Sequence, residues 1–335
     1  MGEYKFIVRV TCKTYNHAAF IKDAMDGFCM QETSFPFLCI IVDDASMDGE
    51  QEVIQNYLNE HFALTGDDDF RRDETDDYIR IYARHKTNTN CYFLVIFLKY
   101  NHYSIKKSKA PYIKEWKDTK YIAMCEGDDY WIDSRKLQRQ YDFMESHPDF
   151  SLCCHNAIVS FENKDKRAFN SVGEDREIKM EELLDKWLCP TASLFIRRSV
   201  LPTFPVNGNI IGGDWRIILH CAASGKVWSI NDVMACYRRT NIRTSMSNTF
   251  AHKSDELFLR KVPILEGLDK YTEGRYHDLI RKHIRFYTVF GKLIQFKKQH
   301  GMLATVLLRP FSIIEIVWKR NIRPRLVKNA PTFSA

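Results

Sequence analysis

Apolar residues in the first 150 positions alternate between short unbroken runs and stretches with helical spacing. The runs are rich in β-branched and aromatic residues and predict buried strands over residues 6–12, 37–42, 78–83, 92–98 and 121–125. The spaced stretches predict helices over residues 18–30, 49–62 and 135–146. Strands that alternate with helices are typical of β-α-β units. We therefore expect an α/β fold, with a mostly parallel sheet and helices on both faces.

The alternation weakens after residue 150. Apolar runs predict further strands over residues 152–161, 192–196 and 227–235, and a helix over residues 214–223. Beyond residue 252 the apolar spacing is helical throughout. We expect one domain over residues 1–250, with halves 1–150 and 151–250, and a helical extension over residues 251–335. The acidic stretch 66–77 predicts a solvated loop.

Composition excludes several classes of protein. Apolar residues make up 45% of the chain, with only 14 glycines and 10 prolines, which excludes disordered and collagen-like chains. The ten cysteines form no C-x-x-C pair and mostly sit inside apolar runs, so we expect buried, reduced thiols in a cytoplasmic protein. The first residues lack the pattern of a signal peptide, and no uncharged apolar run reaches 18 residues.

The net charge of +6 is unevenly distributed. Residues 275–328 hold 13 Lys and Arg against two acidic residues, so a basic tail follows a mildly acidic body. An amphipathic basic helix suits an anionic membrane surface, which predicts peripheral attachment at the inner face of the membrane. The alternative is a helical appendage packed on the domain with a solvated basic face. Nucleic-acid binding has no supporting motif, so we expect no nucleic-acid partner.

Carboxylates gather directly after two of the predicted strands. Asp43 and Asp44 follow one strand, and Glu126, Asp128 and Asp129 follow another. Ligands of open α/β sheets bind outside the carboxyl ends of the strands. Neighbouring carboxylates repel one another unless a cation compensates, and oxygen ligands favour Mg²⁺ or Mn²⁺ completed by substrate phosphates. The alternative interpretation is a surface turn with a helix cap.

Familiar phosphate-binding and hydrolytic motifs are missing. The sequence has no G-x-G-x-x-G, no P-loop, no H-E-x-x-H and no G-x-S-x-G. An α/β protein that binds phosphate without a glycine-rich loop is expected to use a metal ion.

Four segments together carry a family resemblance. In chain order they are VTCKTYNH at 10–17, IIVDDAS at 40–46, CEGDDYW at 125–131 and GGDW at 212–215. The chain resembles the family 2 glycosyltransferases of the GT-A fold over roughly residues 5–245. More narrowly, it looks like the bacterial branch that builds capsular, O-antigen or other surface polysaccharides.

The resemblance implies a donor site for a nucleoside-diphosphate sugar. The first strand-helix turn of such enzymes contacts the nucleotide base, which carries over to Thr14 and Tyr15. The second carboxylate of the next turn holds the base or ribose and matches Asp44. The acidic turn implies that Asp128 faces the ribose or the metal and that Asp129 is the metal ligand.

The resemblance also implies an inverting transfer to a glycan or lipid-linked acceptor. The carboxylate that opens a helix in the acceptor half matches Asp214, which would take the proton of the acceptor hydroxyl. Its alternative role is a helix cap. Trp131 or Trp215 would help to exclude water by covering the sugar.

Three positions depart from the family pattern. Lys13 stands where proline is usual, and Glu126 replaces the first aspartate of the acidic turn. Thr240 stands where a histidine is frequent, with Arg239 or Arg243 as a nearby cationic substitute.

Two other functions remain open at this stage. A sugar-nucleotide nucleotidyltransferase shares the α/β sheet and the metal carboxylates, although it usually shows a glycine-rich basic segment after the first strand. A catalytically silent protein that binds glycans or nucleotide sugars is the other. The segment 101–107 resembles a variable loop on the phosphate side, where Lys106 and Lys107 meet the diphosphate or belong to a solvated helix face.

Overall fold

The computed structural model describes residues 4–66, 68–161, 164–169, 171–207, 210, 212–239 and 258–308, without the side chains of 164–166 and 303–308. The chain divides into two compact units. The first unit comprises Met1–Pro202 with Ile217–Thr240, and the second comprises Thr203–Arg216 with Asn241–Ala335. Each unit is described by itself.

All described strands belong to the first unit. They are β1 (Val8–Thr14), β2 (Phe37–Asp43), β3 (Phe62–Ala63), β4 (Phe70–Glu74), β5 (Tyr78–His85), β6 (Cys91–Leu98), β7 (Tyr121–Met124), β8 (Tyr130–Trp131), β9 (Phe150–Phe161), β10 (Lys164–Ala168), β11 (Arg176–Ile178), β12 (Phe195–Arg197) and β13 (Lys226–Arg239). The helices of the described chain are α1 (Ile21–Cys29), α2 (Glu50–His61), η1 (Ala110–Trp116), α3 (Lys136–Ser146), α4 (Met180–Asp185), η2 (Thr191–Ser193), η3 (Arg198–Val200), α5 (Gly213–Ser224), α8 (Val262–Tyr271) and α9 (His277–Leu308).

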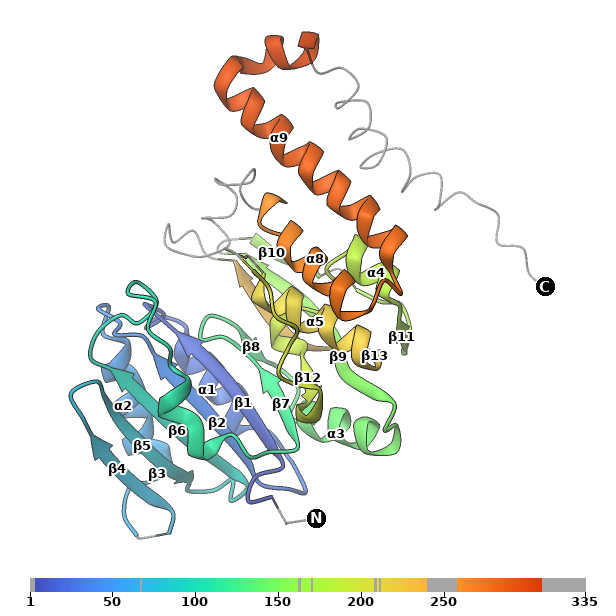
Figure 1. Cartoon of the computed structure of the whole chain (residues 1–335). Helices are drawn as coiled ribbons and strands as arrows, with labels where there is room; N and C mark the ends of the chain where they lie inside the picture. Colours follow the sequence, from blue (N-terminus) through green and yellow to red (C-terminus); the bar gives the residue numbers. More distant parts are fainter. Residues whose placement is uncertain are drawn as a thin grey trace. The chain divides into compact units, whose positions relative to one another are not determined.

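The strands form one mixed sheet in the order β11-β13-β9-β12-β7-β1-β2-β6-β5-β3. Its centre, β7-β1-β2-β6, is parallel, so the carboxyl ends of these four strands share one edge of the sheet (Figure 1). Every residue of β2 is buried, which is typical of a parallel strand covered on both faces. The expected α/β fold is confirmed.

The two faces of the central sheet have separate apolar cores. Residues of α1, α2 and α3, among them Met25, Leu58 and Leu137, pack with the inward side chains of β1, β2 and β6. On the opposite face, Leu38, Ile40 and neighbouring residues pack against η1 through its residues Tyr112, Ile113 and Trp116. The alternation of side chains along each strand therefore supplies both cores.

The acidic stretch 66–77 is not the plain loop that its composition predicts, because it contains β4. This strand pairs antiparallel with β5. The acids in and beside this strand pair with arginines of β5, since Arg80 lies 2.9 Å from Asp73 of β4 and Arg84 lies 3.1 Å from Asp69, the residue before β4. Cross-strand ion pairing of this kind is invisible to a reading of hydrophobic periodicity.

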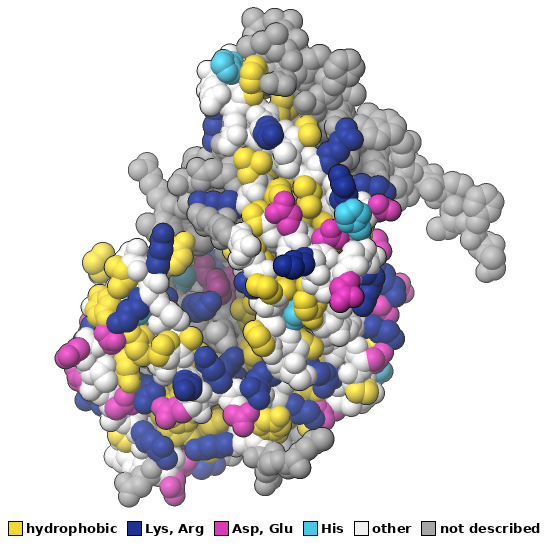
Figure 2. Space-filling model, in the orientation of Figure 1, with side chains coloured by type: hydrophobic (Ala, Val, Ile, Leu, Met, Phe, Trp, Pro, Cys, Tyr) yellow, Lys and Arg dark blue, Asp and Glu magenta, His cyan; other side chains and the backbone are white. Residues whose placement is uncertain are grey.

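In the second unit, α8 and α9 are joined by a short turn rather than forming one continuous helix. Apolar side chains of α8, with Ile264, Leu265 and Leu268 fully buried, supply its core. A Cβ on Gly267 would lie 2.9 Å from the carbonyl oxygen of Pro205, so this helix approaches the 203–207 segment closely. On the face seen in Figure 2, α9 mixes apolar with Lys and Arg side chains. None of the described helices is both long enough and apolar enough to cross a bilayer.

Candidate functional site

Three chain segments meet where β1, β2 and β7 end. The backbone N–H of Asp44 donates to the carbonyl of Thr14 (3.1 Å), and that of Gly127 donates to the carbonyl of Lys13 (3.1 Å). A Cβ on Gly127 would stand only 2.1 Å from Oγ1 of Thr14. The acidic turn therefore needs glycine at this position to lie against the end of β1.

The buried carboxylate of Glu50, at the start of α2, ties two of these segments together. It accepts hydrogen bonds from the Thr14 hydroxyl, from the His17 backbone N–H (2.9 Å) and from the Ser46 hydroxyl (2.7 Å). Burial raises the pKa of Glu50 above its ordinary value, while these hydrogen bonds act to lower it. Glu50 is therefore a positioning residue for the loops that follow β1 and β2.

The acidic turn presents one buried and one half-buried carboxylate. Asp129 is 3% exposed, and its Oδ1 accepts a hydrogen bond from the backbone N–H of Arg238 in β13 (2.8 Å). Burial, and next the negative charge of Asp128, raise the pKa of Asp129 well above its ordinary value. The Asp128 side chain is 24% exposed, and Glu126 is exposed.

Trp131, two residues after Asp129, anchors the acidic turn in the apolar core. Its indole is 1% exposed, donates to the carbonyl of Ala192 (2.8 Å) and packs against Phe28 with ring centres 4.9 Å apart. In the second unit, Trp215 is 5% exposed and packs against Tyr287. Both rings serve the interior of their units, so the expectation that either covers a bound sugar is wrong for the conformation described.

His17 is a site residue that the sequence analysis missed. Its Nε2 lies 3.8 Å from Oδ2 of Asp128, and its Nδ1 lies 3.1 Å from Oγ1 of Thr14. The imidazole therefore links the β1 loop to the acidic turn. Its place directly after T-Y-N was the available signal, because that loop already held two predicted site residues.

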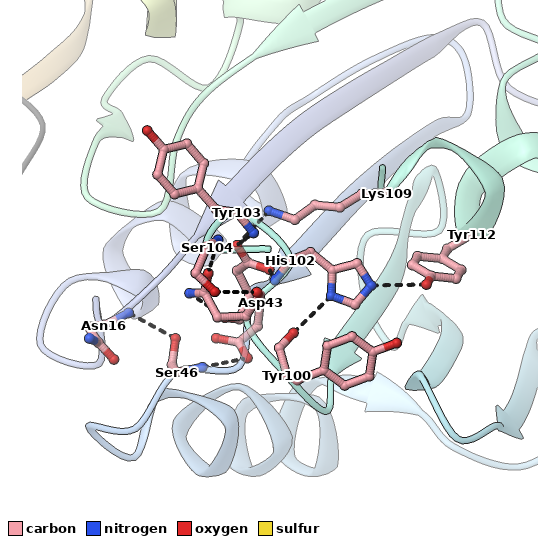
Figure 3. A network of polar contacts seen from close by, with 11 residues as sticks. Asn16, Asp43, Ser46, Tyr100, His102, Tyr103, Ser104, Lys109 and Tyr112 are labelled. Atoms are coloured by element: carbon pink, nitrogen blue, oxygen red, sulfur yellow. Dashed lines mark hydrogen bonds and ion pairs between the residues drawn. The ribbon is translucent and has the colours of Figure 1, made fainter. Parts of the chain in front are cut away.

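The carboxylate of Asp44 is enclosed by the segment that follows β6. It accepts hydrogen bonds from the backbone N–H groups of His102 (2.8 Å) and Tyr103 (3.1 Å), and it pairs with the ammonium of Lys109 (2.8 Å). Figure 3 shows this network around the ends of β2 and β6. Only 5% of the Asp44 side chain is exposed.

Asp214 belongs to the second unit and lies in the first turn of α5. Its Oδ1 accepts the backbone N–H of Trp215 (2.8 Å), a position where a negative charge interacts favourably with the helix dipole. The same unit brings Lys261 near it. Burial lowers the pKa of Lys261, whereas the charge of Asp214 acts to raise it.

The structure thus places the predicted donor-site residues at one edge of the first unit. Thr14, Asp44 and the acidic turn are linked there, and the half-buried Tyr15 lies on the same loop as Thr14. Arg239 is exposed, with its guanidinium 5.9 Å from the Phe161 ring centre. Thr240 and Arg243 lie outside the described residues.

Arg238 is a second residue that the sequence did not single out. In addition to its backbone contact with Asp129, its guanidinium pairs with Asp23 (2.7 Å) and lies 4.9 Å from the Tyr130 ring centre. This side chain therefore braces the acidic turn against α1.

The donor set of the acidic turn fits a metal that a substrate completes. Among the described residues no group of three or more His, Cys, Asp or Glu is arranged to hold a metal alone. Asp128 and Asp129 offer adjacent carboxylates, and Mg²⁺ or Mn²⁺ is typically bound by one or two carboxylates together with substrate phosphates. A divalent cation here would also offset the repulsion that raises the pKa of Asp129.

Comparison with known proteins identifies relatives without established functions. No family model matches the chain. Uncharacterized protein Rv1520 of Mycobacterium tuberculosis and Uncharacterized protein Mb1547 of Mycobacterium bovis are each 28% identical to it over 228 residues. The match covers 68% of this chain and 57% of each relative, so the chain spans a little over half the length of the curated relatives it matches.

A solved structure shares the architecture. TarS of S. aureus, in complex with UDP-GlcNAc, matches with a TM-score of 0.58 at 13% identity, over 93% of this chain and 81% of that chain. At such low identity the likeness concerns the fold alone. The chain has a GT-A-like α/β fold, which it shares with TarS.

Proposed function

We propose that the chain is an inverting glycosyltransferase that moves a sugar from a nucleoside-diphosphate donor to an acceptor hydroxyl. The observation that carries the proposal is the acidic turn at the carboxyl ends of β1 and β7, where Asp129 is buried, Asp128 lies 3.8 Å from His17, and Gly127 packs against Thr14. The GT-A-like fold, which TarS shows with UDP-GlcNAc bound, supports it.

Asp128 and Asp129 would hold Mg²⁺ or Mn²⁺ together with the donor diphosphate. When bound, such an ion neutralises part of the negative charge that develops on the leaving diphosphate. The chain prepares this site by burying Asp129 and fixing one of its oxygens on the backbone N–H of Arg238. Preorganised charges of this kind need no rearrangement during the reaction.

Asp214 would accept the proton of the attacking hydroxyl. A hydroxyl is a poor nucleophile at neutral pH, so a carboxylate that takes its proton during the attack lowers the barrier. A single displacement assisted by one base inverts the anomeric carbon. Thr14 and Tyr15 would contact the nucleoside. We propose a glycan or a lipid-linked acceptor, in the synthesis of a surface polysaccharide.

The test is binding followed by turnover. Isothermal calorimetry would measure the affinities of UDP and GDP with Mn²⁺, with Mg²⁺ and with chelator, for the wild type and for Asp129→Asn. We expect one of the two nucleotides to bind tightly, and to do so only when Mn²⁺ or Mg²⁺ is present. In Asp129→Asn the metal should no longer increase the affinity for that nucleotide. Equal affinity with and without chelator in both proteins would contradict the metal site.

Product analysis separates the alternatives. A transferase releases nucleoside diphosphate from a nucleotide sugar, slowly to water and faster with an acceptor. A nucleotidyltransferase would instead release pyrophosphate from a nucleoside triphosphate and a sugar phosphate. A silent binding protein would bind the nucleotide sugar and release neither product.

A further inference from the structure

Lys261, the residue before α8, occupies a position that suits a lysine poorly. It is the N-cap of that helix, where Ser, Thr, Asp and Asn are the favoured residues, and its side chain makes no capping hydrogen bond. The positive end of the helix dipole also disfavours a cation there. The side chain is half-buried, which adds a cost for removing the ammonium from water. Its stabilisation therefore has to come from elements other than α8.

Two aromatic rings of the second unit receive the Lys261 ammonium. Its Nζ lies 4.9 Å from the ring centre of Trp215 in α5 and 5.4 Å from that of Tyr287 in α9. The two rings are buried, and they pack edge to face with centres 6.3 Å apart. The Tyr287 ring also packs against Phe258, whose carbonyl accepts the Lys261 backbone N–H (3.3 Å). Trp215 and Tyr287 thus form a two-ring cage that stabilises a cation through its attraction to the ring faces.

The cage is built on the residue that follows Asp214. The Trp215 backbone N–H donates to Oδ1 of Asp214 (2.8 Å), so one ring of the cage and the carboxylate belong to the same turn of α5. Burial lowers the pKa of Lys261, and the negative charge of Asp214 acts to raise it. This interaction is mutual, because an ammonium that is stabilised by a carboxylate also favours the ionised form of that carboxylate.

The other charged groups around the cage are cations or a histidine. Arg216 follows Trp215 and donates to the carbonyl of Phe204. Arg260 precedes Lys261 and is half-buried. From α9, His283 lies against Tyr287 with ring centres 6.2 Å apart. Among the described residues, Asp214 is therefore the anion that acts on Lys261.

We propose that Lys261 is a positioning residue for Asp214. The rings of Trp215 and Tyr287 hold its ammonium beside the first turn of α5, where the positive charge keeps the Asp214 carboxylate ionised and able to take a proton. This inference rests on the proposed function, because it assigns a partner to the base that this function requires. Lys261 acts through Asp214 and needs no contact with the substrate.

The first experiment follows the protonation of Asp214 in the full chain without any ligand. ¹³C NMR of protein labelled at aspartate Cγ gives the pH at which each carboxylate takes up its proton, and the Asp214 signal is the one that Asp214→Asn removes. Lys261→Met removes the charge but keeps an unbranched side chain against the rings. The Asp214 midpoint in Lys261→Met should lie about 0.5–1 pH unit above that of the wild type. Lys261→Arg keeps a cation on the rings and should stay within about 0.2 pH units of the wild type.

Lys270→Met is the matched control, because Lys270 is an exposed lysine in the last turn of α8. It should leave the Asp214 midpoint unchanged. A lysine that serves only packing predicts the same midpoint in Lys261→Met as in the wild type, and that result would overturn the proposal. Should Lys261→Met not fold, Lys261→Gln removes the charge with a polar side chain, and its titration decides in the same way.

The second experiment connects the pair to the reaction. The release of nucleoside diphosphate from UDP-glucose and GDP-glucose with Mn²⁺ is measured as a function of pH. At the pH where the wild-type rate has fallen to half on the acidic side, Lys261→Met should be about 2- to 5-fold slower than the wild type. At the plateau it should stay within about twofold, and Lys261→Arg should follow the wild type throughout. An equal loss at every pH would indicate a structural role and would contradict the proposal.

The NMR titration separates the two levels of failure, because it needs no nucleotide. Wild-type protein that binds neither UDP nor GDP with Mn²⁺ contradicts the proposed function, and the titration then still decides whether Lys261 acts on Asp214. An unchanged Asp214 midpoint in a protein that does bind nucleotide contradicts this inference alone.

Discussion

Lys136, the first residue of α3, gives a prediction whose size follows from the structure. Its side chain is fully buried, with Nζ 4.1 Å from the Trp131 ring centre and hydrogen bonded to Oε1 of Gln140 (2.7 Å). The amide nitrogen of Gln140 donates to the carbonyls of Cys153 and Ser193, so its oxygen is the atom that faces the lysine. Burial lowers the pKa of Lys136 from 10.5 to about 7.

The sign follows from proton binding. Between about pH 7 and about pH 10.5 the unfolded chain binds a proton at Lys136 and the folded chain does not. The free energy of unfolding therefore rises with pH in this window, by about 1.4 kcal/mol per pH unit and about 5 kcal/mol in total. Below about pH 7 the full cost of burying the ammonium is present.

The substitution Lys136→Met removes this dependence and roughly keeps the volume. Urea unfolding at about pH 7 and about pH 9 would measure the wild type and the variant. The stability of the variant relative to the wild type should fall by about 2 kcal/mol between these two pH values. Lys120→Met, at a lysine whose side chain is 37% exposed, is the control and should show no such change. A stability difference for Lys136→Met that stays constant with pH would refute the reasoning.

Further predictions concern the site. Gly127→Ala pushes a methyl group against Thr14 and should lower the free energy of unfolding by about 1–3 kcal/mol and weaken nucleotide binding, whereas Gly173→Ala, with open space around it, should do neither. Glu50→Gln replaces a carboxylate oxygen with an N–H₂ donor among three hydrogen-bond donors, so the free energy of unfolding measured in urea should fall by about 1–3 kcal/mol. Glu52→Gln is the exposed control. Asp214→Asn should reduce turnover by about 10²- to 10⁴-fold while calorimetry finds nucleotide affinity unchanged; normal turnover would assign the base elsewhere.

Much of the fold could be predicted because its signals are local. The run FLCIIVD shows no polar alternation, which indicates burial on both faces, and β2 is the buried centre of the parallel strands. The acidic residues that follow β2 and β7 lie at one edge because parallel strands place their ends together.

What the sequence could not supply depends on partners far along the chain. β4 lies in a charged stretch whose acids pair with basic residues elsewhere, Asp73 with Arg80 of β5 and Glu74 with Lys99. His17 lies beside Asp128 of the acidic turn. The Asp44 carboxylate accepts a hydrogen bond from the backbone N–H of His102, far along the chain. From the sequence alone, Trp131 could cover a bound sugar or belong to the core. Its hydrogen bond to the carbonyl of Ala192 and its packing against the ring of Phe28 assign it to the core.

The central claim is that the acidic turn holds a metal together with a nucleoside diphosphate. Anomalous diffraction at the manganese edge, from crystals of the full chain with Mn²⁺ and UDP or GDP, tests it most directly. We predict a manganese peak at about 2.0–2.3 Å from a carboxylate oxygen of Asp129 or Asp128, with diphosphate oxygens completing the coordination. A nucleotide bound away from this turn, or manganese bound without contact to either carboxylate, would contradict the account.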